Sequence, residues 1–129
     1  MDDIWKTLYK KAEEVLNSRN ISSNIEVGGV AAALLTKTGK IYTGVCIDTA
    51  CSIGMCAERN AISNMITNGE SNIDKLVCIK NHNNIMMPCG VCREFMMQLG
   101  EYNKNTEILV NLEKNKTIKL YELLPNWWN

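Results

Sequence analysis

The chain has 129 residues, of which 46% are hydrophobic and 22% are charged, and it carries no formal net charge at pH 7. This length fits a single domain over residues 1–129 with its own core, and the neutral balance argues against a nucleic-acid-binding protein, which usually has a basic surface. No apolar run approaches the roughly 20 residues that span a bilayer. The first residues lack a signal-peptide pattern, so we expect a cytoplasmic protein without membrane partners.

The predicted elements begin with a helix and a β-hairpin. Apolar side chains at helical spacing predict a helix over residues 3–17. Residues 25–36 are rich in small and branched apolar side chains and predict a buried strand. The turn signal Thr38-Gly39 and a second strand over residues 40–47 complete the predicted hairpin.

Helices and strands alternate over the rest of the chain. We predict helices over residues 57–68 and 90–99, strands over residues 73–79, 107–112 and 117–120, and a final helical turn over residues 121–124. Strands separated by helices imply a sheet with parallel pairs that is covered by helices. The predicted fold is therefore an α/β fold, a three-layer α/β/α sandwich with a mixed sheet of about five strands.

Two cysteine motifs precede the predicted inner helices: Cys56-Ala57-Glu58-Arg59 and Pro88-Cys89-Gly90-Val91-Cys92. A structural zinc site is normally closed by four protein ligands, whereas a hydrolytic site keeps one position open for water. Three cysteines with a glutamate beside the first of them therefore indicate a zinc hydrolase.

The positions of these residues at helix starts suggest their roles. A helix N-terminus favours the thiolate form of cysteine. Glu58 points away from Cys56 and can take a proton from the attacking water and pass it on. Three thiolates give a Zn²⁺ site a net negative charge, which a nearby cation should offset. Arg59 and Arg93 lie next to the cysteines and are the candidates.

Other uses of these residues stay open. Six cysteines could form disulfides in an oxidising compartment. A closed site, in which zinc only holds the fold, could take its fourth ligand from Cys46, Cys51, Cys78 or His82. We interpret Cys78 as a small buried side chain and His82 as a loop residue. We interpret the methionines as core and loop filler rather than a binding surface: Met86, Met87, Met96 and Met97.

Most of the chain resembles the small homotetrameric cytidine deaminases, and it is also similar to blasticidin-S deaminase. Besides the cysteine motifs, the resemblance rests on the strand Val30-Ala31-Ala32-Ala33-Leu34-Leu35, the hairpin segment Gly39-Lys40-Ile41-Tyr42-Thr43-Gly44 and the ending Glu122-Leu123-Leu124-Pro125. It implies hydrolytic, zinc-dependent deamination of cytidine or deoxycytidine in pyrimidine salvage, with release of ammonia.

The resemblance also implies a role for individual residues. Cys56, Cys89 and Cys92 would bind Zn²⁺, Glu58 would shuttle protons, and the backbone near Ala57 would bind the pyrimidine edge. An aromatic residue after the Leu-Pro pair would reach the active site of a neighbouring subunit in the homotetramer. The equivalent residue here is Trp127 or Trp128.

The sequence departs from the family pattern at the residues that would bind the sugar of the nucleoside. Cys46 and Asp48 stand where relatives carry the Asn-x-Glu pair that holds the ribose hydroxyls, and a thiol is a poor hydrogen-bonding partner. Gly28-Gly29 replaces an aromatic residue, and Glu94 replaces a glutamine. The expected partner is a small aminopyrimidine nucleoside. The alternative is another amino-heterocycle nucleoside, such as blasticidin S.

Overall fold

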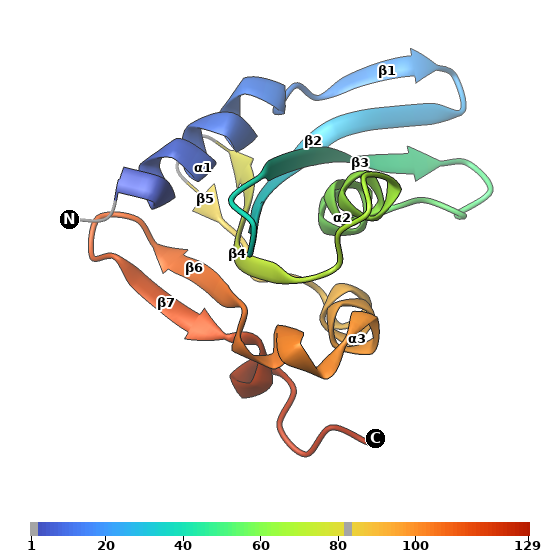
Figure 1. The fold of residues 1–129 in the computed structure, drawn as a ribbon. Coiled ribbons are helices and arrows are strands. Elements are labelled where there is room, and N and C mark those ends of the chain that lie inside the picture. Colours follow the sequence, from blue (N-terminus) through green and yellow to red (C-terminus); the bar gives the residue numbers. More distant parts are fainter. Residues whose placement is uncertain (1–2, 82–83) are drawn as a thin grey trace.

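The computed structural model describes residues 3–81 and 84–129. The elements follow the predicted order (Figure 1), with the bounds α1 Asp3–Val15, β1 Arg19–Ser22, β2 Ile25–Thr36, β3 Ile41–Thr49, α2 Ala57–Thr67, β4 Ile73–Asn81, β5 Asn84–Ile85, α3 Gly90–Leu99, β6 Glu107–Asn111 and β7 Lys116–Lys119, and the 3₁₀ helices η1 Glu101–Asn105 and η2 Leu120–Leu123. In the described part of the chain, no helix is long and apolar enough to cross a membrane.

The strands form one mixed sheet. Its central path runs β1-β2-β4-β6-β7, with β3 paired to β2 and β5 paired to β4. The β4–β6 pair is parallel, with Lys75 opposite Glu107, while β2 pairs with β3 and with β4 antiparallel. The described residues form seven strands rather than about five. The two extra strands are short: β1 is exposed along its length and β5 has only two residues, so neither shows the apolar pattern that predicts a strand.

Helices cover both faces of the sheet, as predicted for a three-layer sandwich. Helix α1 lies on one face, and α2 and α3 lie on the other (Figure 1). The side chains of β2 alternate accordingly. Ala31 and Ala33 pack in the cluster that contains Trp5 of α1, whereas Ala32 and Leu34 pack in the cluster that contains the buried residues of α2 and α3.

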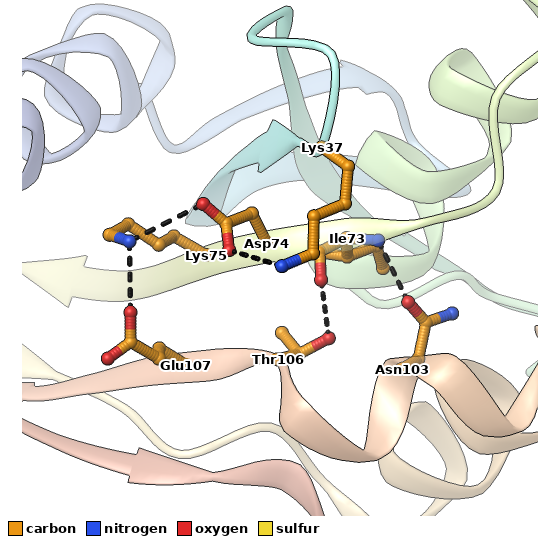
Figure 2. Close-up of polar contacts among 7 residues, drawn as sticks. All are labelled: Lys37, Ile73, Asp74, Lys75, Asn103, Thr106 and Glu107. Carbon is orange, nitrogen blue, oxygen red and sulfur yellow. Dashed lines mark hydrogen bonds and ion pairs between the residues drawn. The ribbon is translucent and has the colours of Figure 1, made fainter.

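Polar contacts fasten the start of β4 to the segment that leads into β6 (Figure 2). The Oδ1 atom of the buried Asn103 accepts a hydrogen bond from the Ile73 N–H at 2.8 Å. The Thr106 hydroxyl donates to the Ile73 carbonyl at 2.7 Å. These buried groups are therefore satisfied within the protein, and they fix the start of β4.

Candidate metal centre and active site

The three cysteines of the two motifs meet where two helices begin. Cys56 is the N-cap residue of α2, and Cys89 is the N-cap residue of α3. The Cys56 and Cys89 sulfurs are 3.5 Å apart, and the Cys89 and Cys92 sulfurs are 3.6 Å apart. All three sulfurs lie within 4.8 Å of one another, as the spacing of the motifs predicts.

This group fits zinc. Thiolates at the usual Zn–S distance of about 2.3 Å in a tetrahedron are roughly 3.8 Å apart, which is close to the observed separations. All six cysteines are free, so the disulfide alternative is wrong. The group of three contains none of the proposed fourth ligands Cys46, Cys51 and Cys78, and His82 lies outside the described residues. Within residues 3–81 and 84–129, the site therefore offers three protein ligands, and zinc bound by them would keep a fourth position for water.

The thiols differ in their pKa values. Burial raises the pKa of Cys89, but hydrogen bonds from the Cys92 N–H and from neighbouring thiols outweigh it, so the pKa is lowered overall. Burial, with the hydrogen bond to Cys89, raises the pKa of Cys56. Burial and the charge of Glu58 raise that of Cys92. The lowered pKa of Cys89 favours its thiolate at the start of α3, and a bound cation would favour the thiolates of Cys56 and Cys92 as well.

The two arginines lie differently. Desolvation lowers the pKa of Arg59, but interactions with the Cys56 and Cys92 sulfurs outweigh it and raise the pKa overall. Arg59 also lines the pocket described below, and its Nε is a buried donor without a partner among the described atoms. Arg93 instead donates to the carbonyls of Pro88 at 2.7 Å and Leu123 at 3.2 Å. Arg59 is therefore the guanidinium next to the sulfurs, and Arg93 supports the backbone before Cys89.

Glu58 lies in the first turn of α2 and is only 4% exposed. Burial raises the pKa of its carboxyl group, although hydrogen bonds from its own backbone N–H, the Cys78 thiol and the Cys89 N–H oppose this effect. A carboxyl group with a raised pKa exchanges protons more readily near neutral pH than an exposed one.

One pocket of about 430 Å³ brings the predicted residues together. This volume lies within the range of about 300–1,000 Å³ that is usual for small-molecule sites. Of the residues predicted from the sequence, its lining includes Cys46, Asp48, Cys56, Ala57, Glu58, Arg59 and Cys89. A small molecule in this pocket would therefore contact the cysteine group and Glu58 at the same time.

Other lining residues were missed. Met86 and Met87 pack against the core, as predicted, but they also line the pocket, whereas Met96 and Met97 are buried. The position of the Met86-Met87 pair directly before Pro88-Cys89 could have indicated this role. The remaining wall comes from Val30 and Ile47 and from the segment 52–55, where the sequence carries no motif.

The C-terminal tryptophans lie outside this pocket. The Trp127 indole donates to both carboxylate oxygens of Glu94, at 3.0 and 3.2 Å, and the Trp128 indole donates to Glu94 at 2.8 Å. Trp128 is 70% exposed. Within one chain, the tryptophans therefore contact α3 and not the cysteine group's pocket.

The fold is that of known cytidine deaminases. The structure of cytidine deaminase from Mycobacterium tuberculosis matches with a TM-score of 0.80 over 99% of this chain and 99% of that chain, at 24% identity. The structure of cytidine deaminase from Mycobacterium leprae matches with a TM-score of 0.77 over 97% of this chain and 100% of that chain, at 28% identity.

Comparisons of sequence identify the family. A probable cytidine deaminase of Dictyostelium discoideum is 33% identical over 100 residues, which cover 74% of this chain and 65% of that protein. A blasticidin-S deaminase of Bacillus cereus is 30% identical over 107 residues, which cover 74% of each protein. The family model "cytidine and deoxycytidylate deaminase zinc-binding region" matches residues 5–106. The chain therefore belongs to the cytidine and deoxycytidylate deaminase family of zinc-dependent hydrolases.

Proposed function

We propose that the protein deaminates cytidine or deoxycytidine to the uridine form with release of ammonia. The observation that carries this proposal is that a buried carboxyl group, Glu58, lines the same pocket as Cys56 and Cys89 of the cysteine group. Such an arrangement suits an attack by water on an amino-substituted ring carbon, followed by loss of the amine.

Each step can be assigned to a side chain. When bound by Cys56, Cys89 and Cys92, zinc would lower the pKa of water towards ~7 and so supply a nucleophile at neutral pH. Glu58 accepts one proton of the attacking water and delivers it to the ring nitrogen, and it then carries the remaining hydroxyl proton to the amine, which leaves as ammonia while the ring carbonyl forms. Arg59 offsets the negative charge of the three thiolates, which would otherwise weaken the acidity of the water.

The pocket wall supports binding of a flat heterocycle. Ala57 is the first residue of α2, so its backbone N–H lacks a partner within the helix and can donate to the polar edge of a pyrimidine. Val30, Met86 and Met87 supply apolar surface for the ring faces.

A second candidate substrate is a nucleoside with a different appendage, such as blasticidin S, the compound in the name of the Bacillus cereus relative. The Cys46 thiol already accepts a hydrogen bond from the Val30 N–H at 3.2 Å. Of the two residues that stand in the family's ribose-binding positions, only Asp48 thus keeps its full capacity to bind a hydroxyl group. This weakened sugar recognition favours the second candidate.

We also propose that the chain acts as a cytoplasmic homotetramer in pyrimidine salvage, with Trp127 or Trp128 contributing to a neighbouring subunit's pocket. The proposal is supported by family membership and by the exposure of Trp128. Light scattering on the purified protein tests the tetramer. Deamination by Trp127→Ala and Trp128→Ala variants that remain tetrameric tests the contribution across subunits.

The substrate is tested by ammonia release from zinc-loaded protein with cytidine, deoxycytidine, cytosine and blasticidin S. Release from the cytidines supports the first candidate, and release from blasticidin S alone supports the second. If zinc is bound and the protein is folded but no compound is deaminated, both candidates fail and a purely structural zinc is favoured. The zinc-loaded Cys89→Ser variant provides a control for contaminating deaminases, because it lacks a metal ligand.

A further inference from the structure

Asp48 brings a negative charge to the mouth of the pocket. It lines the pocket together with Cys46 and Glu58, but the three residues differ in exposure: Glu58 is buried, Cys46 is half-buried and Asp48 is exposed. They therefore mark the base, the wall and the mouth of the pocket. Within residues 3–81 and 84–129, the Asp48 carboxylate forms neither a salt bridge nor a hydrogen bond with another side chain.

A second carboxylate lies beside the first. Glu26 is directly opposite Asp48 in the antiparallel β2–β3 pair, and residues paired in this way have their side chains on the same face of the sheet. Glu26 is exposed, and it too forms no salt bridge in the part of the chain that the structure describes. Like charges directly opposite each other destabilise a strand pair. A cation bound next to them would remove this repulsion.

The other polar groups near the mouth do not balance this charge. The Cys46 sulfur is neutral when protonated and already accepts a hydrogen bond from the Val30 N–H at 3.2 Å. Arg59 is the cationic residue among the described lining residues, and it lies next to the cysteine group rather than at the mouth. A cleft with an excess of one charge attracts ligands of the opposite charge and repels those of the same charge.

We propose that the substrate carries a cationic group, an amine or a guanidine, on the part of the molecule that extends from the ring, and that Asp48 binds this group while Glu26 adds to the attraction. The inference rests on the proposed deaminase function, because the appendage lies at the mouth only if the ring reaches Glu58 at the base. It narrows the substrate to positively charged aminopyrimidine nucleosides and disfavours phosphorylated ones.

Calorimetric binding to zinc-loaded Glu58→Gln protein tests the inference in the absence of turnover. The ligands are cytidine, two cytidine analogues in which one or the other sugar hydroxyl is replaced by an amino group, and cytidine monophosphate. At neutral pH and low ionic strength, we expect at least one amino analogue to bind about 5-fold more tightly than cytidine, and the monophosphate to bind more weakly. Added salt should reduce both differences, because it screens exposed charges.

Carboxylate variants identify the residue that is responsible. The measured quantity is the affinity for the amino analogue divided by that for cytidine. Asp48→Asn, made in the same zinc-loaded protein, should abolish the preference, and Glu26→Gln should reduce it in part. Glu113→Gln is the matched control, because it neutralises an exposed carboxylate that lies outside this pocket, and it should keep the full preference. Equal affinities for cytidine and both amino analogues, or an unchanged preference in Asp48→Asn, would overturn the inference.

Ammonia release by the zinc-loaded wild type separates this inference from the proposed function. Deamination of cytidine by a protein that shows no preference for the amino analogues overturns the inference and supports the function. A preference that depends on Asp48, in a protein that deaminates none of these compounds, supports the recognition of charge and refutes the function. If none of the compounds binds, both proposals fail.

Discussion

Gly44 of β3 lies against the backbone of Ala61 in α2. A Cβ atom on Gly44 would collide with the Ala61 nitrogen and would lie 2.8 Å from the Asn60 carbonyl carbon. Next to this contact, the Asn60 side chain donates to the Val45 carbonyl at 3.0 Å. Helix α2 thus packs directly against the backbone of β3, and this contact sets the position of Cys56 and Glu58 at the start of the helix.

Gly44→Ala should therefore disturb the site as well as the fold. Inserting a methyl group into a packed contact typically costs about 1–3 kcal/mol, and the strain is relieved only if α2 moves away from β3. We expect a lower free energy of unfolding in urea and a loss of zinc affinity. Gly29→Ala is the control, because the nearest atom to its added Cβ would be the Ser18 hydroxyl at 3.9 Å. Equal stability of the two variants would show that the contact with β3 does not constrain α2.

Arg59→Gln should weaken zinc binding, turnover or both. Its guanidinium interacts with the Cys56 and Cys92 sulfurs, and loss of such a supporting group typically reduces metal affinity or activity by about 10–100-fold. Competition with a chromophoric chelator measures the affinity. Arg19→Gln, which removes an exposed guanidinium on β1, should leave both quantities unchanged. If Arg59→Gln also keeps the zinc affinity and turnover of the wild type, Arg59 does not offset the charge of the thiolates.

The ion pairs around Asp74 predict a pH-dependent contribution to stability (Figure 2). Lys37 and Lys75 lie 3.0 and 3.4 Å from its carboxylate oxygens. Burial raises the pKa of Asp74, but these lysines outweigh burial, so the pKa in the folded state is below its ordinary value of 3.8. The stabilisation is therefore fully present above that ordinary value and is lost as the pH falls through the folded-state pKa.

Asp74→Asn should accordingly lower the free energy of unfolding by about 0.5–1 kcal/mol at pH 7, and the difference from the wild type should shrink in acid. Urea denaturation across the pH range measures this difference. Zinc release in acid affects both proteins alike and therefore cancels in the comparison. The exposed Glu113 provides the control variant Glu113→Gln. If the stability difference between Asp74→Asn and the wild type instead grows as the pH falls, the predicted direction of the pH dependence is wrong.

Glu94→Ala should release the C-terminal segment from α3. The Glu94 carboxylate accepts hydrogen bonds from both indoles and from Gln98, and these bonds connect the C-terminal segment to α3. We expect a red-shifted tryptophan emission and faster proteolysis near the C-terminus. Glu113→Ala should change neither, and an unaltered emission in Glu94→Ala would show that this carboxylate does not hold the tail.

The sequence predicted the buried elements well. The bounds of β2 and α3 agree with the predictions, because their apolar patterns report directly on burial between two layers. The meeting of Cys56, Cys89 and Cys92 was also predictable, since each motif marks a helix start and the sheet brings the two starts to one edge. The residue types and spacing within a short motif are enough to predict its chemistry.

Features that depend on three-dimensional neighbours were not predictable. The contact between Gly44 and α2 and the lining role of Ile47 involve residues that have no local signature. Arg59 and Arg93 both lie within a few residues of a ligand cysteine, and the sequence does not show which guanidinium lies near the sulfurs and which binds carbonyls.

The most direct test of the account compares Glu58→Gln with the wild type, both loaded with zinc, for ammonia release from cytidine. We predict that the variant keeps its zinc and its thermal stability and loses at least about 100-fold in kcat, because the amide cannot accept and return the proton. A variant that retains its zinc and deaminates cytidine at the wild-type rate would contradict the central claim that Glu58 is the proton shuttle of this site.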